Sequence, residues 1–344
     1  MTDAGPRRAH RAARLEAHVR ALAAARLRRR GWRPAVVPHV GYGSEGWVRA
    51  LARVVLVPPG SPRQAREDGR GWRRFLTIAA PGIPVTIQVG GHAHRVTSAR
   101  EGYVDTRLAS DLGPGWHPAT YSVESGVPVA ARVHVVGPTT RFGLVSDVDD
   151  TVIETMLPRP LVAFRNAFLT RESARTPVPG MSELYAEITE AHPDIFVVYL
   201  STGAWNTAVP LQAFLARHRY PPGPLLLTDW GPTDQGWFRS GADHKRAQLR
   251  TLFDDLPGLR WLLVGDDGQH DPGLYAEAAA AAPDRVLGVA IRQVSLAQHV
   301  AHGRVAPPDA VAGDTRSPEP VTARDGFGLR DALRARGILG SDRL

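Results

Sequence analysis

The pattern of apolar and polar positions divides the chain into four parts. Residues 8–31 carry apolar side chains at helical spacing, with arginines elsewhere around the same helix. From Ala35 to about Thr140 the pattern changes to short β-type runs separated by Gly and Pro, spaced as in a β-sandwich of seven or eight strands. Beyond Arg141 apolar runs alternate with helical segments, and the last part is rich in proline. We therefore expect a basic amphipathic helix at 1–34, a β-sandwich domain at 35–140, an α/β domain at 141–303, and a Pro-rich linker with a short C-terminal helix at 304–344.

The third part predicts a parallel sheet. Its candidate strands are almost continuously apolar, and amphipathic helical patterns fill the intervals between them. Strands of this kind indicate a sheet whose two faces are both covered by helices, as in the doubly wound α/β class. The candidate strands are 142–146, 195–200, 225–228, 260–265 and 285–291.

Composition restricts the chemistry more than the fold. The sequence has no cysteine, which excludes disulfides, thiolate metal sites and cysteine nucleophiles. Any catalysis must therefore use oxygen or nitrogen groups. No apolar run approaches the roughly 20 residues that span a bilayer, and the first residues do not have the form of a secretory signal. The expected location is cytoplasmic, with peripheral contact to a membrane as an option.

Positive charge is concentrated at the start of the chain. Residues 1–34 hold ten arginines against Asp3 and Glu16, a local balance of +8 that equals the net charge of the whole chain. A basic segment of this kind suits an anionic partner, either a lipid surface or a nucleic acid. Two alternatives stay open: a general preference for arginine would give the same surface, and the apolar stripe of the helix could pack on the protein's own body.

Lysine is almost absent from the chain. Of the 42 basic residues 41 are arginine, and Lys245 is the single lysine. An ammonium is a compact point charge that enters a small site where a planar guanidinium does not fit. We therefore expect Lys245, at the start of a helix after the third strand, to be functional.

Acidic and hydroxyl side chains follow the expected parallel strands, at the edge where such sheets bind ligands. The first strand runs into Asp147 and Asp149, two carboxylates that can face one pocket, the first to attack phosphorus and the second to protonate a leaving oxygen. The second strand ends in Ser201 and Thr202, whose hydroxyl and backbone N–H groups can hold phosphate oxygens. This pattern indicates phosphoryl chemistry.

The fourth strand runs into the acidic sequence GDDGQHD. It supplies Asp266, Asp267 and Asp271, and carboxylate oxygens are the ligands that a hard cation such as Mg²⁺ prefers. An alternative interpretation is that Asp271, directly before Pro272, caps the next helix. The two roles are compatible.

The ordered motifs DxDxT, Ser/Thr, Lys and GDxxxxD resemble those of the haloacid dehalogenase superfamily. The resemblance can be narrowed to one branch of the superfamily by five stretches: SDVDDTVIET, PGMSELY, YLSTGAWN, LLLTDWG and GDDGQHDPGLY. They are similar to the catalytic domain of the fungal actin-patch phosphatidate phosphatase family and its bacterial relatives, over roughly residues 137–295. Two departures lie beside the substrate path and bear on substrate identity: Gly203-Ala204 stands where relatives have Ser-Pro, and Asp267 where they have Ser.

The resemblance implies a haloacid dehalogenase-like fold with a minimal cap, a Mg²⁺ cofactor and a set of site residues. The implied catalytic residues are Asp147 as nucleophile, Asp149 as acid and then base, and Lys245 and Ser201 as phosphoryl ligands. Thr202, Thr151 and Asn206 are implied on the substrate side, with Thr151 bracing the loop. The implied metal residues are Asp147, Asp149 through its carbonyl, Asp266, and Asp267 or Asp271 through water.

The function implied is that of a Mg²⁺-dependent phosphatase that hydrolyses phosphatidate to diacylglycerol and phosphate. The intervals between the first, second and third motifs are only about 50 and 44 residues, which leaves little room for a large cap. An open site admits bulky or surface-bound substrates, whereas small metabolites usually need a lid that excludes water. The alternatives are a phosphatase for nucleic-acid ends or phosphoproteins, and a non-catalytic adaptor.

Overall fold

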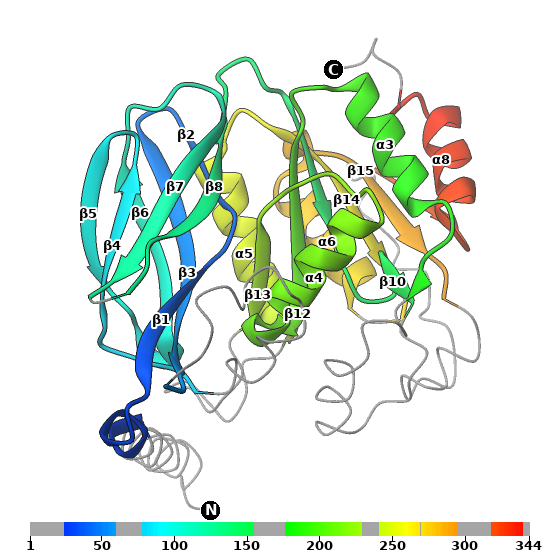
Figure 1. Cartoon of the computed structure of the whole chain (residues 1–344). Coiled ribbons are helices and arrows are strands. Elements are labelled where there is room, and N and C mark those ends of the chain that lie inside the picture. The colour runs from blue at the N-terminus through cyan, green and yellow to red at the C-terminus, as the bar shows by residue number, and fades with distance from the viewer. Residues whose placement is uncertain are drawn as a thin grey trace, which may run out of the picture. The chain divides into compact units, whose positions relative to one another are not determined.

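The structure is a computed structural model in which two compact units are distinguished (Figure 1). The first unit contains Met1–Gly137, Gly203–Ala208 and Thr228–Asp243, and the second contains Pro138–Thr202, Val209–Leu227 and His244–Leu344. The structure describes residues 24–59, 78–124, 126–154, 176–228, 241–268, 270–294 and 318–339.

The first unit is built on eight strands that form one hydrogen-bonded sheet. The strands are β1 (Arg33–Pro38), β2 (Gly41–Ser44), β3 (Trp47–Val57), β4 (Pro84–Val89), β5 (His92–Thr97), β6 (Tyr103–Ala109), β7 (Gly115–Val123) and β8 (Val129–Val136). Their order is β1-β3-β2-β8-β7-β4-β5, and β6 pairs with β3. All pairs are antiparallel apart from β2 and β8, which are parallel. The β domain that the strand spacing predicts is thus confirmed.

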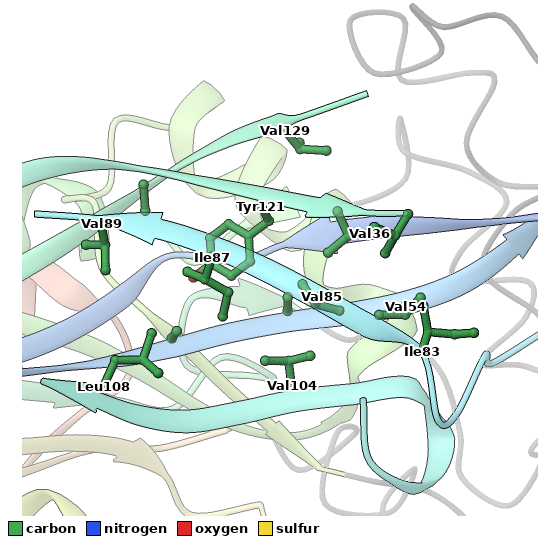
Figure 2. Packing of buried hydrophobic residues seen from close by; sticks show 14 of the residues in the cluster. Val36, Val54, Ile83, Val85, Ile87, Val89, Val104, Leu108, Tyr121 and Val129 are labelled. Atoms are coloured by element: carbon green, nitrogen blue, oxygen red, sulfur yellow. The ribbon is translucent and has the colours of Figure 1, made fainter. Parts of the chain in front are cut away.

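The sheet of the first unit encloses a single apolar core. Strand β4 buries every second side chain, Val85, Ile87 and Val89, because successive side chains of a strand point to opposite faces. Figure 2 shows these side chains packing together with Tyr121 of β7 and Leu108 of β6. In β4 the apolar alternation of the sequence therefore sets which face of the strand is buried.

The end of the expected N-terminal helix packs on this core. Residues 24–29 are helical, and the rest of the helix expected at 8–31 lies outside the described residues. Ala24 belongs to the buried cluster, and Leu27 and Trp32 pack against it. None of the helices that the structure describes has the length and apolar character needed to cross a bilayer.

The second unit contains a six-stranded sheet in the order β13-β12-β9-β14-β15-β16. Its strands are β9 (Phe142–Ser146), β12 (Phe196–Ala204), β13 (Leu225–Thr228), β14 (Arg260–Asp266), β15 (Val286–Arg292) and β16 (Val321–Ala323). The pairs β12–β9, β9–β14, β14–β15 and β15–β16 are parallel. In chain order this arrangement reads 3-2-1-4-5-6, the doubly wound topology. The five expected strands are confirmed.

Helices connect these strands, as the expected pattern requires. The helices are α3 (Met181–Ala191), α4 (Ala208–Arg217), α5 (Gly241–Asp255), α6 (Asp271–Ala281) and α8 (Gly326–Ala335). Helix α3 precedes β12, and α4, α5 and α6 lead into β13, β14 and β15 (Figure 1). A short antiparallel pair, β10 (Ile153–Glu154) with β11 (Thr176–Pro177), follows β9.

The C-terminal segment is part of the second unit, an outcome that the sequence pattern left open. Strand β16 extends the parallel sheet beside β15, and α8 packs against α3 (Figure 1). The two helices meet at Gly180 and Gly326, where a side chain on Gly326 would lie against the Gly180 backbone. Leu329 and Leu333 of α8 are fully buried. The linker expected from residue 304 lies outside the described residues up to 317.

Candidate active site

Three neighbouring strands bring their polar ends to one edge of the sheet. Asp147 follows β9 directly, and the last residue of β9 pairs with Tyr199 of β12 and Val264 of β14. Ser201 and Asp266 come two residues after those partners and Asp147 one residue after Ser146, so all three polar groups lie at the same edge of the sheet. Strand β9 is also where the winding direction of the sheet reverses, which is where doubly wound sheets bind ligands.

A buried ion cluster lies at this edge. Lys245 Nζ donates to Asp147 Oδ1 at 2.6 Å and to Asp271 Oδ1 at 2.5 Å. Carboxylate oxygens of Asp147, Asp266 and Asp271 all lie within 4.8 Å of one another. All four side chains are 2% exposed or less. Because three carboxylates face one ammonium, the cluster holds an excess of buried negative charge, which is costly without a further cation.

Burial governs the ionisation of this cluster. It raises the pKa of Asp147 to about 7, an effect that Lys245 reduces and that Asp271 and Asp149 increase. It also raises the pKa of Asp266 well above its ordinary range, with Asp271 and Asp147 adding to the effect. Burial opposes the charge of Lys245, but the two carboxylates bonded to it more than offset this and raise its pKa. The lysine therefore stays protonated, whereas the raised pKa values of Asp147 and Asp266 disfavour the ionisation of these two carboxyl groups.

The free carboxylate oxygens fit a divalent cation. The Oδ2 atoms of Asp266 and Asp271 are buried and have no hydrogen-bond partner among the described residues. Asp266 Oδ1 accepts from the Gly268 backbone N–H at 2.7 Å, which fixes the orientation of that carboxylate. Buried acceptors left unpaired are rare and costly, and carboxylate oxygens are ligands that Mg²⁺ prefers. The donor set thus suits a hard metal ion.

Gly265 permits this close approach of acids. A Cβ at this position would lie 2.5 Å from Asp271 Oδ2 and 2.8 Å from the ring of Tyr275. Asp271 is the first residue of α6, and the cap position before it is His270, which makes no capping hydrogen bond. The carboxylate of Asp271 therefore bonds Lys245, and the alternative role as a helix cap is not what the geometry shows.

Hydroxyl groups hold the two carboxylates of the DxDxT motif. Thr151 Oγ1 donates to Asp147 Oδ2 at 3.2 Å, so the loop brace expected of Thr151 acts directly on the proposed nucleophile. Ser201 Oγ donates to Asp149 Oδ2 at 3.1 Å. Asp149 is half-buried, unlike the buried Asp147, and so combines a fixed position with access to solvent.

Three expected residues remain: Asp267, Thr202 and Asn206. Asp267 Oδ1 accepts from the Val294 backbone N–H at 2.8 Å, so this carboxylate holds the end of β15 and is not part of the three-carboxylate group. Thr202 is half-buried beside Ser201. The side chain of Asn206 lies outside the described part of the structure.

Sequence reasoning missed several residues that support the site. Arg292, at the end of β15, is buried and donates to the Asp150 carbonyl at 2.7 Å. Ser146 Oγ donates to the Asp147 carbonyl at 2.6 Å and is 2.7 Å from the Tyr185 hydroxyl. Arg292 was hidden among 41 arginines; an arginine closing an apolar strand was the signal that could have identified it.

The part of the chain that carries this site is similar to known proteins. Residues 142–293 match the family model described as phosphatidate phosphatase APP1, catalytic domain. Phosphatidate phosphatase APP1 of Saccharomyces cerevisiae is 28% identical over 153 residues, which are 44% of this chain and 26% of the yeast protein. An uncharacterised protein of Schizosaccharomyces pombe is 28% identical over 155 residues, 44% of this chain and 25% of that protein. The matched part is about a quarter of the length of these relatives.

Similar solved structures are more distant. The HAD domain of the effector Lem4 from Legionella pneumophila is 14% identical, covers 44% of this chain and 85% of its own, and has a TM-score of 0.31. A carbohydrate acetylesterase from Xanthomonas citri is 10% identical, covers 90% of this chain and 77% of its own, and also has a TM-score of 0.31. At these TM-scores neither likeness supports a conclusion about the chain.

The family match and the ion cluster coincide. The matched residues run from the start of β9 to the end of β15 and include every member of the cluster, from Asp147 to Asp271. Residues 142–293 of this chain are therefore similar in sequence to the catalytic domain of the phosphatidate phosphatase APP1 family.

Proposed function

We propose that the chain is a Mg²⁺-dependent phosphatase that hydrolyses a phosphate monoester through an aspartyl-phosphate on Asp147, with phosphatidate as its substrate. The observation that carries this proposal is the buried group of Asp147, Asp266 and Asp271 around Lys245. The family match supports the substrate.

The negative charge of the site defines the task of the metal. A phosphate dianion that approaches Asp147 meets like charge, so the encounter is repulsive unless a cation is present. The carboxylates of Asp147 and Asp266 and the backbone carbonyl of Asp149 would hold Mg²⁺, and of the two alternatives Asp267 and Asp271 it is Asp271, a member of the three-carboxylate group, that would orient its waters. The ion would neutralise the approaching phosphate and the charge that develops during transfer.

The protein's own groups account for the two half-reactions. A carboxylate oxygen of Asp147 forms a bond to phosphorus as the ester P–O bond breaks, and Asp149 gives its proton to the departing alkoxide. Asp149, now a carboxylate, takes a proton from the water that hydrolyses the aspartyl-phosphate. Lys245 and Thr151 each bond one oxygen of Asp147 and fix its orientation, and Ser201 and Lys245 would hold phosphoryl oxygens.

The substrate assignment rests on the family and on charge. Phosphatidate presents its phosphate at an anionic membrane, where each arginine near the surface contributes about 1 kcal/mol. The basic segment at 1–34 would provide this contact and place the protein at the cytoplasmic face of a membrane; its arginines before residue 24 lie outside the described residues. A minimal cap is expected because the intervals between the motifs are short. Parts of those intervals, 155–175 and 229–240, also lie outside the described residues.

A substrate panel tests the proposal. Phosphate release should be measured with Mg²⁺ on phosphatidate vesicles, on oligonucleotides with 3′- or 5′-phosphates, and on phosphopeptides, with Asp147→Asn as the inactive control. The proposal expects Mg²⁺-dependent release from phosphatidate that Asp147→Asn abolishes. Faster release from oligonucleotides or peptides would replace the lipid substrate by one of the alternatives, and no release from any of them would favour an adaptor.

A further inference from the structure

We propose that Arg292 is a positioning residue of the active site, which fixes the turn after Asp149 and joins it to the C-terminal segment β16–α8. This inference deepens the proposed function and rests on it for its kinetic readout. It assigns a catalytic consequence to a buried arginine and to a segment, 321–335, that lies beyond the family match at 142–293.

The guanidinium of Arg292 contacts three segments that are far apart in sequence. Its Nη1 donates to the Asp150 carbonyl at 2.7 Å, and its Nε donates to the Arg324 carbonyl at 3.1 Å. Its Nη2 lies 3.4 Å from Glu154 Oε1 in β10. The side chain is only 5% exposed. Because the N–H groups of a planar guanidinium point in fixed directions, they hold these three oxygen acceptors in one relative arrangement.

The first of these contacts acts on the turn that carries Asp149. Asp150 has a φ of +60°, a left-handed conformation that residues other than glycine rarely adopt. Its N–H donates to the Ile153 carbonyl at 2.8 Å, and its own carbonyl accepts from Arg292. Both backbone groups of Asp150 are thus held. The directions of the Asp149 side chain and carbonyl follow from this turn, because Asp149 is the preceding residue.

The end of β15 and the two residues after it, 292–294, also bond the acidic loop that follows β14. The Asp267 N–H donates to the Arg292 carbonyl at 3.0 Å, and the Asp267 carboxylate accepts from Val294 at 2.8 Å. Residues 292–294 are therefore bonded to the loop after β9 and to the loop after β14. The first loop begins at Asp147 and the second directly follows Asp266, the last residue of β14, so a displacement of Arg292 should change the spacing of the acidic groups.

The C-terminal segment completes this arrangement. Arg324, whose carbonyl accepts from Arg292, lies between β16 and α8. The Gln293 N–H donates to the Ala323 carbonyl at 2.7 Å, so β16 and the end of β15 are bonded next to this contact. Helix α8 in turn packs on α3 (Figure 1). We infer that β16–α8 serves as a support for the catalytic turn.

A purely structural role for Arg292 is the alternative, and the chain offers a matched control. Arg285 precedes β15 at its opposite end and likewise donates to three acceptors, all backbone carbonyls: Leu259 at 2.8 Å, Phe253 at 3.3 Å and Leu256 at 2.7 Å. Loss of Arg285 removes three hydrogen bonds directly before the same strand, at the end remote from the acidic loops. A merely structural arginine and a positioning arginine therefore predict different outcomes.

The test compares Arg292→Met, Arg292→Lys and Arg285→Met in the full chain, at a temperature where circular dichroism shows all of them folded. We expect Arg292→Met to lower kcat about 100-fold, since a displacement of about 1 Å in an active site can cost this much. KM should change little, and calorimetric titration should show a reduced affinity for Mg²⁺. Arg292→Lys should recover part of the loss, because one ammonium can serve only some of the acceptors. Arg285→Met should lower the melting temperature and leave kcat and Mg²⁺ affinity unchanged.

Either of two results would overturn the inference: wild-type kcat and Mg²⁺ affinity in Arg292→Met, or an equal loss of kcat in Arg285→Met. If the wild type releases no phosphate from any ester, the proposed function fails, and hydrogen exchange still decides the role of Arg292. The inference then requires faster exchange of the Asp150 amide in Arg292→Met than in Arg285→Met. Equal exchange in the two variants would overturn it.

Discussion

Replacing Lys245 by methionine tests whether the ammonium of Lys245 stabilises the fold by offsetting the charge of the buried carboxylates. Methionine keeps an unbranched stem of similar length but removes the ammonium that bonds Asp147 and Asp271. The carboxylates of Asp147, Asp266 and Asp271 then remain buried without this cation. The variant should fold less stably whenever those groups are ionised and no metal is present.

The expected magnitude follows from burial. Breaking a buried ion pair by removing one partner costs about 3–5 kcal/mol, whereas an exposed pair contributes about 0–1 kcal/mol. Lys245 is 2% exposed, so the larger range applies. A whole protein is stable by about 5–15 kcal/mol. The substitution should therefore remove a substantial part of the free energy of unfolding.

The loss should depend on pH in a defined direction. Burial raises the pKa of Asp147 from the ordinary value of 3.8 to about 7, so between these values the folded state binds a proton that the unfolded chain has released. Stability from this group therefore rises as pH falls from 7 towards 3.8. Without the ammonium of Lys245 the folded-state pKa lies higher still. The deficit of Lys245→Met should be largest at pH 8 and smaller at pH 5.5.

Urea denaturation in the presence of EDTA at pH 8 and pH 5.5 measures this difference. The matched control is Arg246→Met, one residue further along α5, because Arg246 forms an exposed ion pair with Glu277 at 2.7 Å. The control should lose about 1 kcal/mol or less. If Lys245→Met is as stable as the wild type at pH 8, or if its deficit is the same at both pH values, the reasoning about the cluster is refuted.

Three further predictions use other parts of the structure. Asp266→Asn should raise the melting temperature of the metal-free protein, because it removes buried negative charge. It should also abolish the stabilisation by Mg²⁺, which is about 2.7 kcal/mol for the wild type at an Mg²⁺ concentration of 100 times Kd. An unchanged response to Mg²⁺ would contradict this prediction. Gly265→Ala should destabilise by about 1–3 kcal/mol in urea denaturation, because its Cβ would lie 2.5 Å from Asp271 Oδ2, whereas Gly258→Ala, with no contact closer than 4.0 Å, should not. Burial, with a smaller effect of Arg53, lowers the pKa of His39 to about 3. The contribution of His39 to stability is therefore complete above pH 6.5 and is lost as pH falls from there towards 3. His39→Phe should flatten the pH dependence of unfolding over that range, and an unaltered curve would refute this prediction.

The sheet of the second unit could be predicted because its strands are buried on both faces. Runs such as 142–146 and 195–200 are almost entirely apolar, and the residues that follow them carry the chemistry. Strand β16 could not be predicted in this way. It has only three residues, Val321–Ala323, and its pairing with β15 depends on tertiary contacts rather than on a periodic pattern.

The candidate site could be predicted as a set of residues but not as a geometry. The acidic sequence after β14 does not show which carboxylates face the cation. In the structure Asp271 joins the cluster, while Asp267 turns to the amide of Val294. That choice depends on the residues that follow the neighbouring strand β15, which supply the amide. Arg292 was missed for the same reason, since its acceptors at Asp150 and Arg324 are close in space and distant in sequence.

The account depends on Asp147 accepting the phosphoryl group, and trapping the phosphoenzyme tests this most directly. The wild type, mixed with Mg²⁺ and phosphatidate vesicles and quenched in acid, is reduced with borohydride, which converts an acyl phosphate on aspartate to homoserine, and the peptides are analysed by mass spectrometry. The account predicts homoserine at position 147, dependent on Mg²⁺ and on substrate. Steady phosphate release with position 147 unmodified, or with the modification at another carboxylate, would contradict it.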